Sequence, residues 1–362
     1  MLDRMAAKAR QQNVLSTVML ELTYQCNLDC TFCYNDLNLK GKRLSLEQYK
    51  TLLDDLADMN VMMLTLSGGE PLMYPHFFEL GAHARQRGFL VTVKSNAVPL
   101  NQNNAQRLRE EVDPYLVETS LHGACAETHD KLTRVDGSFD RLLKNVRILR
   151  SLGIKVQLNS TLTCWNEGEV EDMLDLADEL GIILRFNTEV SPRDDGDMSP
   201  LALAPTAEGK ANMFRLTLER VRAKQQAGPV PLKAPAKPGS EVPPAPGNGT
   251  PAPNKICGAG STYLTIDPFG TVLPCVQYRR AAGNLHRQSI REIWEHSADL
   301  QDVRRTAERA HEIALGAGIG QFCMGLSELH HGDPLVITES ALDTGTLFKR
   351  LNWEVFGGED AA

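Results

Sequence analysis

The stretch "ELTYQCNLDCTFCYND", residues 21–36, carries three of the eight cysteines of this chain, directly after an apolar run. Cys26, Cys30 and Cys33 have the spacing C-x3-C-x2-C. Thiolates at such short spacing converge only if the backbone wraps around their target, which suits an iron–sulfur cluster. A zinc site would usually use a fourth Cys or His nearby, and this loop has none. A structural metal site and incidental cysteines remain the alternatives.

The composition describes a globular protein without a nucleic-acid or membrane partner. The chain has 362 residues, 42% of them hydrophobic, which is enough for a large core and a second, smaller domain. Its formal net charge of −8 argues against nucleic-acid binding. No stretch approaches the roughly 18 apolar residues of a membrane span, and the first residues contain no apolar run, so we expect no secretory signal. We therefore expect a cytoplasmic protein with reduced thiols, whose clustered cysteines indicate metal binding or catalysis.

Apolar strands alternate with helical patterns between Val14 and about Pro205. This order predicts βα units, a parallel sheet covered on both faces, and right-handed crossovers. Two more units would be needed for a complete eightfold barrel. The predicted strands lie in "TVMLELTY", "VMMLTLS", "FLVTVKS", "YLVETSL", "KVQLNSTLT" and "ILRFNTEV".

The helices and the later part of the chain are predicted from caps and turn residues. Ser45 and Gln48 form a capping-box pattern at the start of the first long helix. Residues 227–254 hold nine of the nineteen prolines, which predicts a semi-extended linker. "TYLTIDPFGTVLPC" predicts a hairpin, and a helix follows from about Ile290. The predicted organisation is an N-terminal extension (1–13), a barrel (14–205), a connecting helix (206–226), the linker (227–254) and a C-terminal domain (255–362).

Several motifs together resemble the radical SAM enzymes. They are the cysteine loop after the first strand, with an aromatic residue before the third Cys, "LSGGEP" after the second strand, "SLHGACAETHDKLTRVDGSFD" after the fourth, and "SPRDDGDMSPL" after the sixth. The resemblance covers about residues 14–205. Through "TYLTIDPFGTVLPC" and "GNLHRQSIREIW" it extends more weakly to the SPASM/twitch subgroup. It implies an α/β fold: a partial (β/α)6 TIM-like barrel with a smaller C-terminal SPASM/twitch-like α+β domain.

The resemblance also implies a chemistry. Cys26, Cys30 and Cys33 would hold a 4Fe–4S cluster, whose open iron binds the amino and carboxylate groups of S-adenosylmethionine (SAM). An external one-electron donor would drive SAM cleavage to a 5′-deoxyadenosyl radical, which abstracts a substrate hydrogen. The protein would place the reactants and exclude water.

Matching the motifs position by position gives the implied cofactor contacts. Phe32 would pack beside the adenine, and Gly68, Gly69 and Glu70 would contact the methionyl amino group. Polar residues at strand ends are further candidates, although Ser and Asn are also common there as caps and turn formers. These candidates are Ser95, Asn96, Ser120, Asn159 and Ser160.

Two isolated cysteines are harder to interpret. Cys164 follows the fifth strand, so we expect it near the barrel mouth. There a thiol could donate a hydrogen atom or join a metal site, which makes Cys164 a catalytic candidate beside Glu70. The competing interpretation is buried packing, which free cysteines usually provide. Cys125 is expected to be a small buried residue.

The C-terminal cysteines match the SPASM pattern only in part. Cys257, Gly270 and Cys275 fit its beginning, whereas no Cys follows Cys323. Because alanine cannot ligate iron, two complete auxiliary clusters are excluded. With Cys323 aligned, the other expected positions hold Ala314, Ala317 and Ser327.

Three interpretations of Cys257, Cys275 and Cys323 remain open. They hold one cluster with a different fourth ligand, or another metal, or no metal at all. Candidate fourth ligands are Ser327, His330, His331, an aspartate or the substrate. Since cluster sites usually use four protein ligands, the sequence slightly favours a domain without a cluster.

The sequence therefore predicts a radical SAM enzyme of the SPASM/twitch group. Modification of a ribosomally made peptide is the first expectation for its reaction. The alternatives are a small-molecule substrate, such as a carbohydrate or a tetrapyrrole, and a non-catalytic scaffold with a decayed auxiliary domain.

Overall fold

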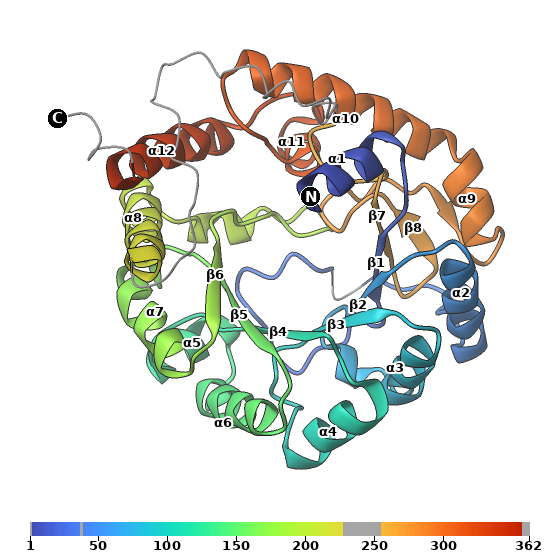
Figure 1. The fold of residues 1–362 in the computed structure, drawn as a ribbon, viewed down its shortest axis with the longest axis horizontal. Helices are drawn as coiled ribbons and strands as arrows, with labels where there is room; N and C mark the ends of the chain where they lie inside the picture. The colour runs from blue at the N-terminus through green and yellow to red at the C-terminus, as the bar shows by residue number, and fades with distance from the viewer. Residues whose placement is uncertain (1, 37–38, 227–254, 357–362) are drawn as a thin grey trace.

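One curved sheet organises the computed structural model, which describes residues 2–36, 39–226 and 255–356 (Figure 1). Among these residues the strand order is β6-β5-β4-β3-β2-β1-β7-β8-β9. All neighbouring pairs from β1 to β6 are parallel. The predicted partial barrel is confirmed.

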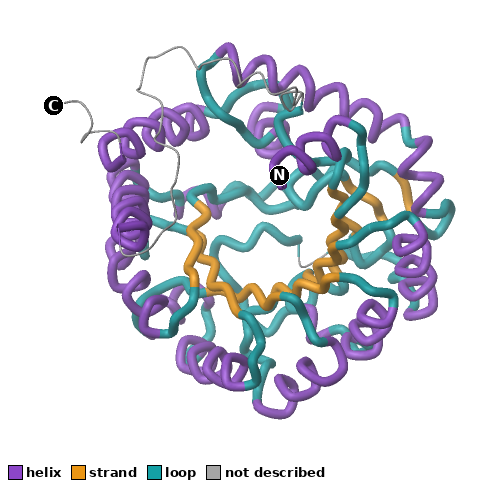
Figure 2. Tube along the Cα trace, viewed as in Figure 1, coloured by secondary structure: helices purple, strands orange, loops and turns teal. Residues whose placement is uncertain are grey.

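Each of the six predicted strands forms, and each is followed by helical structure on the outside of the sheet (Figure 2). The strands are β1 (Thr17–Glu21), β2 (Met63–Ser67), β3 (Leu90–Lys94), β4 (Leu116–Ser120), β5 (Val156–Thr161) and β6 (Ile183–Asn187). The outer helices are α2 (Leu46–Asp58), α3 (Phe77–Gln86), α4 (Gln102–Arg107), α5 (Ala126–Thr133), α6 (Ser138–Ser151) and α7 (Val170–Glu179). Short turns are η1 (Pro71–Met73), the π-helical η2 (Leu108–Val112), η3 (Glu167–Glu169) and η4 (Ser199–Leu203).

Helix α2 illustrates how local sequence fixes an outer helix. The Ser45 hydroxyl accepts the Gln48 N–H at 3.2 Å, and the Gln48 side chain accepts the Ser45 N–H at 3.0 Å. This reciprocal capping box satisfies two N–H groups that a helix start leaves open. The apolar face of α2 then packs on the sheet through the buried residues Tyr49, Leu52, Leu53 and Leu56.

The expectation that both faces of the sheet are covered holds for β1 and β2, which are buried at nearly every position, but not for β4. Along β4, Val117 is buried in the barrel core, whereas Glu118 and Ser120 are half-exposed and line a pocket. Side chains alternate along a strand, so one face of β4 packs on the helices and the other faces an open interior. Polar residues at these inner positions line the pocket described below.

The C-terminal segment continues the sheet rather than standing apart from it. Strand β7 (Tyr263–Ile266) pairs in parallel with β1, while β8 (Thr271–Leu273) and β9 (Gly283–Asn284) add antiparallel strands. The predicted hairpin is thus confirmed. Leu264 and Ile266 are fully buried in the same core as the barrel strands. The two predicted domains share one sheet, and β7 joins the barrel core, while other C-terminal residues form a second, smaller core.

Helices at both ends of the chain complete the molecule. They are α1 (Leu2–Gln11), α8 (Ala207–Gln226), α9 (Ile290–His296), α10 (Ala298–Gly316), α11 (Met324–His331) and α12 (Glu339–Phe356). Helix α12 packs along α8, with the rings of Phe214 and Phe348 5.4 Å apart. The Arg10 guanidinium donates to the carbonyl of Lys255, which ties α1 to the C-terminal segment. The predicted linker, 227–254, lies outside the described residues.

Within the described ranges, no helix has the length and apolar character needed to cross a bilayer.

Candidate active site

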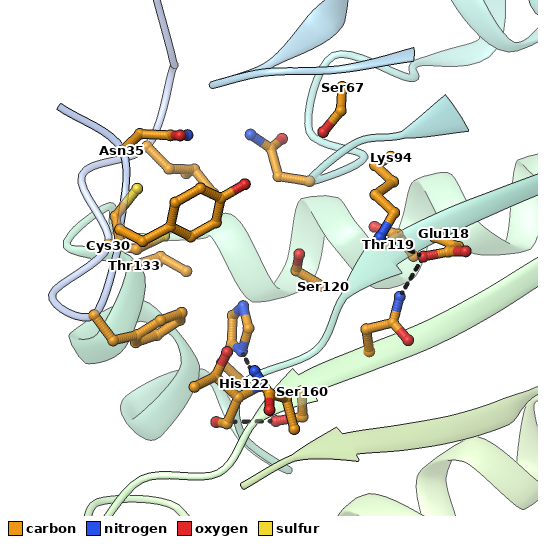
Figure 3. Close-up of a pocket in the computed structure, with 18 of the residues that line it drawn as sticks. Cys30, Asn35, Ser67, Lys94, Glu118, Thr119, Ser120, His122, Thr133 and Ser160 are labelled. Carbon is orange, nitrogen blue, oxygen red and sulfur yellow. Dashed lines mark hydrogen bonds and ion pairs between the residues drawn. The ribbon is translucent and has the colours of Figure 1, made fainter. Parts of the chain in front are cut away.

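A pocket of about 470 Å³ opens at the carboxyl ends of β1–β6 (Figure 3). This is the size range of small-molecule and cofactor sites. Barrel sites normally lie at this end of the strands. Cys26, Cys30 and Cys33 all line it, so the structure brings the predicted cluster ligands to the expected place.

The three thiols have the surroundings of cluster ligands. All are free and half-buried. Burial raises the pKa of each thiol, and the neighbouring Cys33 raises the pKa of Cys26 and Cys30 further. Thiolates crowded in this way are stabilised by a bound cation, because a metal keeps a coordinating thiol deprotonated. The donor set fits an iron–sulfur cluster, which holds its thiolates farther apart than a single ion does.

Backbone hydrogen bonds position the cysteine loop between two elements. The N–H groups of Asp29 and Thr31 donate to carbonyls at the end of α5, at 3.1 and 3.0 Å. On the other side, the Gly69 N–H donates to the Thr23 carbonyl at 2.7 Å.

The Gly-Gly turn is required sterically. Gly68 has φ +132°, and a Cβ there would lie 2.3 Å from the Thr23 carbonyl oxygen. A Cβ on Gly69 would lie 2.5 Å from the Gln25 carbonyl oxygen. Only glycine allows this close approach, which explains the motif's place against the cysteine loop.

Glu70 is fully buried and braces the end of β3. Its carboxylate accepts hydrogen bonds from the Ser95 hydroxyl and the Asn96 N–H, each at 2.9 Å, and from the Leu72 N–H at 3.2 Å. Burial raises the pKa of Glu70 to about 7. Glu70 is not among the described pocket-lining residues, whereas Gly68, Gly69, Ser95 and Asn96 are. Its contact with the methionyl group stays a prediction.

Phe32 lines the pocket beside a histidine that sequence reasoning missed. The ring centroids of Phe32 and His122 are 4.6 Å apart. Burial lowers the pKa of His122 to about 3 and that of His129 to about 4, so both rings are neutral. The Nδ1 atom of the His129 ring accepts a hydrogen bond from the backbone N–H of His122 at 3.1 Å. The position of His122 in "SLHG", directly after β4, is the sequence feature that could have indicated this pocket residue.

The strand-end candidates of β4 and β5 also meet in the pocket. Ser120, Asn159 and Ser160 all line it. The Asn159 amide donates to the Glu118 carboxylate at 3.1 Å and accepts from the Gln157 amide at 2.9 Å. Asn159 therefore has protein partners on both sides of its amide, and its predicted place near the ribose stays a prediction.

The isolated cysteines lie elsewhere. Cys164 is exposed and is not among the described pocket-lining residues; its sulfur lies 3.9 Å from the Ala202 carbonyl. Cys125 is exposed as well. The expectation that these cysteines are buried packing is wrong, and the pocket geometry does not support the catalytic role predicted for Cys164.

The C-terminal cysteines form a second group of thiols. Burial raises the pKa of Cys257, and that of Cys275 to about 11; the nearby Cys323 adds to both shifts. Cys257 and Cys275 pack against a separate small core beside α10. In the described ranges, no three His, Cys, Asp or Glu side chains are arranged for a single metal ion. Cys257 and Cys323 are 66 residues apart in the sequence, and the fold brings them near each other and near Cys275.

Of the suggested fourth ligands, Ser327 is buried and its hydroxyl donates to the Cys323 carbonyl at 3.0 Å. His330 and His331 are exposed. The choice among them stays open to experiment.

A buried ionic network links the barrel to the C-terminal segment. The Arg279 guanidinium lies 3.2 Å from the Glu21 carboxylate and 3.1 Å from that of Asp194. The Tyr24 hydroxyl donates to Glu21 at 3.0 Å. Glu21 is fully buried; burial raises its pKa, and Arg279 opposes the rise. The network connects β1, the loop after β6 and the C-terminal segment, and no sequence motif indicated it.

The fold, the cysteine loop and the Gly-Gly turn define the class of protein: an enzyme built to hold an iron–sulfur cluster and SAM at the mouth of a partial barrel. Comparison with family models agrees. Residues 20–177 match the radical SAM superfamily, and residues 257–315 match the SPASM iron–sulfur cluster-binding domain. The chain belongs to the radical SAM superfamily and carries a SPASM domain. Cys323 lies beyond the matched part of that domain.

Curated relatives match across both regions. The chain is 28% identical to an AdoMet-dependent heme synthase of Methanosarcina barkeri, over 82% of this chain and 86% of the relative. It is 30% identical to the mycofactocin maturase MftC of Mycobacterium tuberculosis, over 78% of this chain and 71% of the relative.

Solved structures confirm the fold. Streptococcus suis SuiB bound to SAM has a TM-score of 0.69 at 17% identity, covering 93% of this chain and 80% of SuiB. The enzyme anSMEcpe with bound AdoMet has a TM-score of 0.64 at 15% identity, covering 94% of this chain and 96% of that one.

Proposed function

We propose that this radical SAM enzyme abstracts a hydrogen atom from a ribosomally made peptide and thereby modifies it. The observation that carries the proposal is one pocket of about 470 Å³ that joins the cysteine loop to a polar interior. Similarity to the mycofactocin maturase across both regions favours a peptide as the substrate.

Cys26, Cys30 and Cys33 would hold the 4Fe–4S cluster, and the Gly68–Gly69 turn and Phe32 would hold SAM against it. When bound, cluster and SAM supply a carbon radical on reduction by an external electron donor. The chain itself orients the reactants and keeps water away. Glu70 fixes the end of β3 beside the SAM contacts, and neutral His122 offers an uncharged polar ring next to Phe32.

We also propose that Cys257, Cys275 and Cys323 hold a second cluster. The proximity of the three thiols and the partial burial of Cys257 and Cys275 support this against the cluster-free domain that the sequence slightly favoured. The matched domain family is described by the same property. Three thiolates leave one position for Ser327 or another ligand.

A tetrapyrrole is the alternative substrate. The similarity to an AdoMet-dependent heme synthase extends over a larger share of both chains than that to the maturase. A small-molecule substrate would use the same pocket and the same cofactors.

An anaerobic turnover assay distinguishes a peptide substrate from a tetrapyrrole substrate. The reconstituted chain would be incubated with SAM, dithionite and either a pool of short synthetic peptides or iron coproporphyrin III. We expect 5′-deoxyadenosine together with a mass change in one peptide. A mass change in the tetrapyrrole alone would replace the proposal by its alternative. Failure to form 5′-deoxyadenosine with any of them would contradict both.

A further inference from the structure

The pocket has two chemically different ends. Figure 3 places Cys30 and Asn35 on one side, and Lys94 and Glu118 on the opposite side. The first side belongs to the predicted cluster and SAM. The second is built by inner-face residues of β3 to β6, and nothing in the SAM chemistry requires its charges.

Four charged side chains line this pocket among the described residues: Lys94, Glu118, Arg185 and Glu189. Glu118 is already neutralised. Its carboxylate lies 3.2 Å from the Lys94 ammonium and accepts the Asn159 amide at 3.1 Å. The Lys94–Glu118 pair therefore adds no net charge to the pocket.

Glu189 is compensated in a similar way from outside the barrel. The Lys210 ammonium of α8 lies 3.6 Å from its carboxylate. The Ser340 hydroxyl at the start of α12 lies 3.0 Å from both carboxylate oxygens. This carboxylate therefore already has partners on α8 and at the start of α12.

Arg185 is the charge that remains. It stands on β6, directly opposite Asn159 in the β5–β6 register, and its side chain is exposed to the pocket. Across the described part of the chain it has no hydrogen bond, ion pair or ring contact. A guanidinium presents a planar fork of N–H donors that matches a carboxylate, and it is always charged. An unpaired guanidinium inside a pocket marks the place of an anionic ligand group.

We infer that Arg185 binds a carboxylate of the substrate, which anchors the substrate across the pocket from the cluster. The inference rests on the proposed function and narrows its substrate class. The carboxylate can come from a peptide C-terminus or from a propionate arm of a tetrapyrrole. SAM also has a carboxylate, but an iron–sulfur cluster held by Cys26, Cys30 and Cys33 would bind that group at the cysteine end.

Matched pairs of probes test the inference on the holoenzyme, reconstituted anaerobically with SAM and without reductant. The first pair is two pools of synthetic pentapeptides without Asp or Glu, one with free C-terminal carboxylates and one amidated. The second pair is coproporphyrin III and its tetramethyl ester. Binding is measured for the parent, Arg185→Gln, Arg185→Lys and the control Arg215→Gln. Arg215 is an exposed residue of α8 and is not among the described pocket-lining residues.

The parent should prefer the acid in one pair by about ten- to hundred-fold, the value of a hydrogen bond to a charged group. Arg185→Gln should lose this preference, Arg185→Lys should retain part of it, and Arg215→Gln should retain all of it. Preference within the peptide pair supports both the carboxylate site and the peptide substrate. Preference within the porphyrin pair alone supports the site and overturns the peptide.

Three outcomes overturn the carboxylate site. One is equal binding of acid and neutral probes, or an acid preference that survives in Arg185→Gln; the proposed function then stands without the site. Another is failure of every probe to bind the parent. The third is a matching loss of SAM affinity in Arg185→Gln with unchanged acid preference, which would assign Arg185 to the carboxylate of SAM.

Discussion

The two groups of cysteines in this chain are built by different means. Cys26, Cys30 and Cys33 lie in one short loop, which backbone hydrogen bonds hold between the Gly-Gly turn and α5. Cys257, Cys275 and Cys323 come from three separate segments and meet only because the C-terminal chain folds around its own small core. A local ligand set can be recognised from sequence spacing alone, whereas a dispersed set needs the tertiary structure.

The largest effect is expected at the local group. Cys30→Ala should abolish formation of 5′-deoxyadenosine, because two thiolates cannot replace three at the cluster. The assay is anaerobic SAM cleavage after reconstitution. Cys125→Ala, which removes an exposed thiol outside both groups, should cleave SAM like the parent. Turnover retained in Cys30→Ala would remove Cys30 from the ligand set.

The ion pair between Arg279 and Glu21, which links the C-terminal segment to the barrel, should contribute several kcal/mol to the free energy of unfolding. Arg279→Met would leave the fully buried Glu21 without its cation, and breaking one partner of a buried ion pair costs about 3–5 kcal/mol. The neighbouring Arg280 pairs with Asp299 and Asp302 at the surface, so Arg280→Met should cost about 0–1 kcal/mol. Urea unfolding measures both. Equal losses would mean that Arg279 does not join the two regions.

The histidines of the two regions should respond differently to acid. Burial lowers the pKa of His129 to about 4, so between that value and 6.5 the unfolded chain binds more protons than the folded protein. The stability from neutral His129 is complete above pH 6.5 and is lost as the pH falls toward 4. His129→Gln should reduce the stability difference between pH 7 and pH 5 by about 2 kcal/mol.

The control for this prediction is His296→Gln at the end of α9, where the side chain is exposed. Its stability difference between the two pH values should match that of the parent. Urea unfolding at pH 7 and pH 5 provides all the values. A His129→Gln protein as acid-sensitive as the parent would contradict the assignment of a neutral, buried ring.

The smallest effect tests whether the two regions unfold together. Ser45 caps α2 in the barrel, and Ser289 caps α9 in the C-terminal segment. Replacing either by Ala should cost about 1 kcal/mol, while Asp at the same position should preserve the cap. Because the sheet is continuous and α9 packs in the barrel core through Ile290 and Ile293, both Ala variants should shift one common urea transition. A separate transition moved only by Ser289→Ala would show that the regions unfold independently.

The sequence was sufficient for the barrel and for one side of its site. The six strands, the α2 capping box and the cysteine loop depend on patterns within about twenty residues, where local rules apply. The pairing of β7 with β1 joins segments more than 240 residues apart, and no local pattern encodes that partner. The link from Glu21 to Arg279 and the unpaired charge of Arg185 depend on the same long-range placement. The exposed Cys164 was misjudged because strand-end position alone does not say which way a loop turns.

Iron and sulfide content per chain in two triple variants, Cys26/Cys30/Cys33→Ala and Cys257/Cys275/Cys323→Ala, tests most directly whether both groups of thiols hold clusters. After anaerobic reconstitution, each variant should retain about four irons, the content of one 4Fe–4S cluster. Only the first should lose SAM cleavage. Iron near zero in the first variant would contradict the account of the C-terminal group, and SAM cleavage by that variant would contradict the account of the active site.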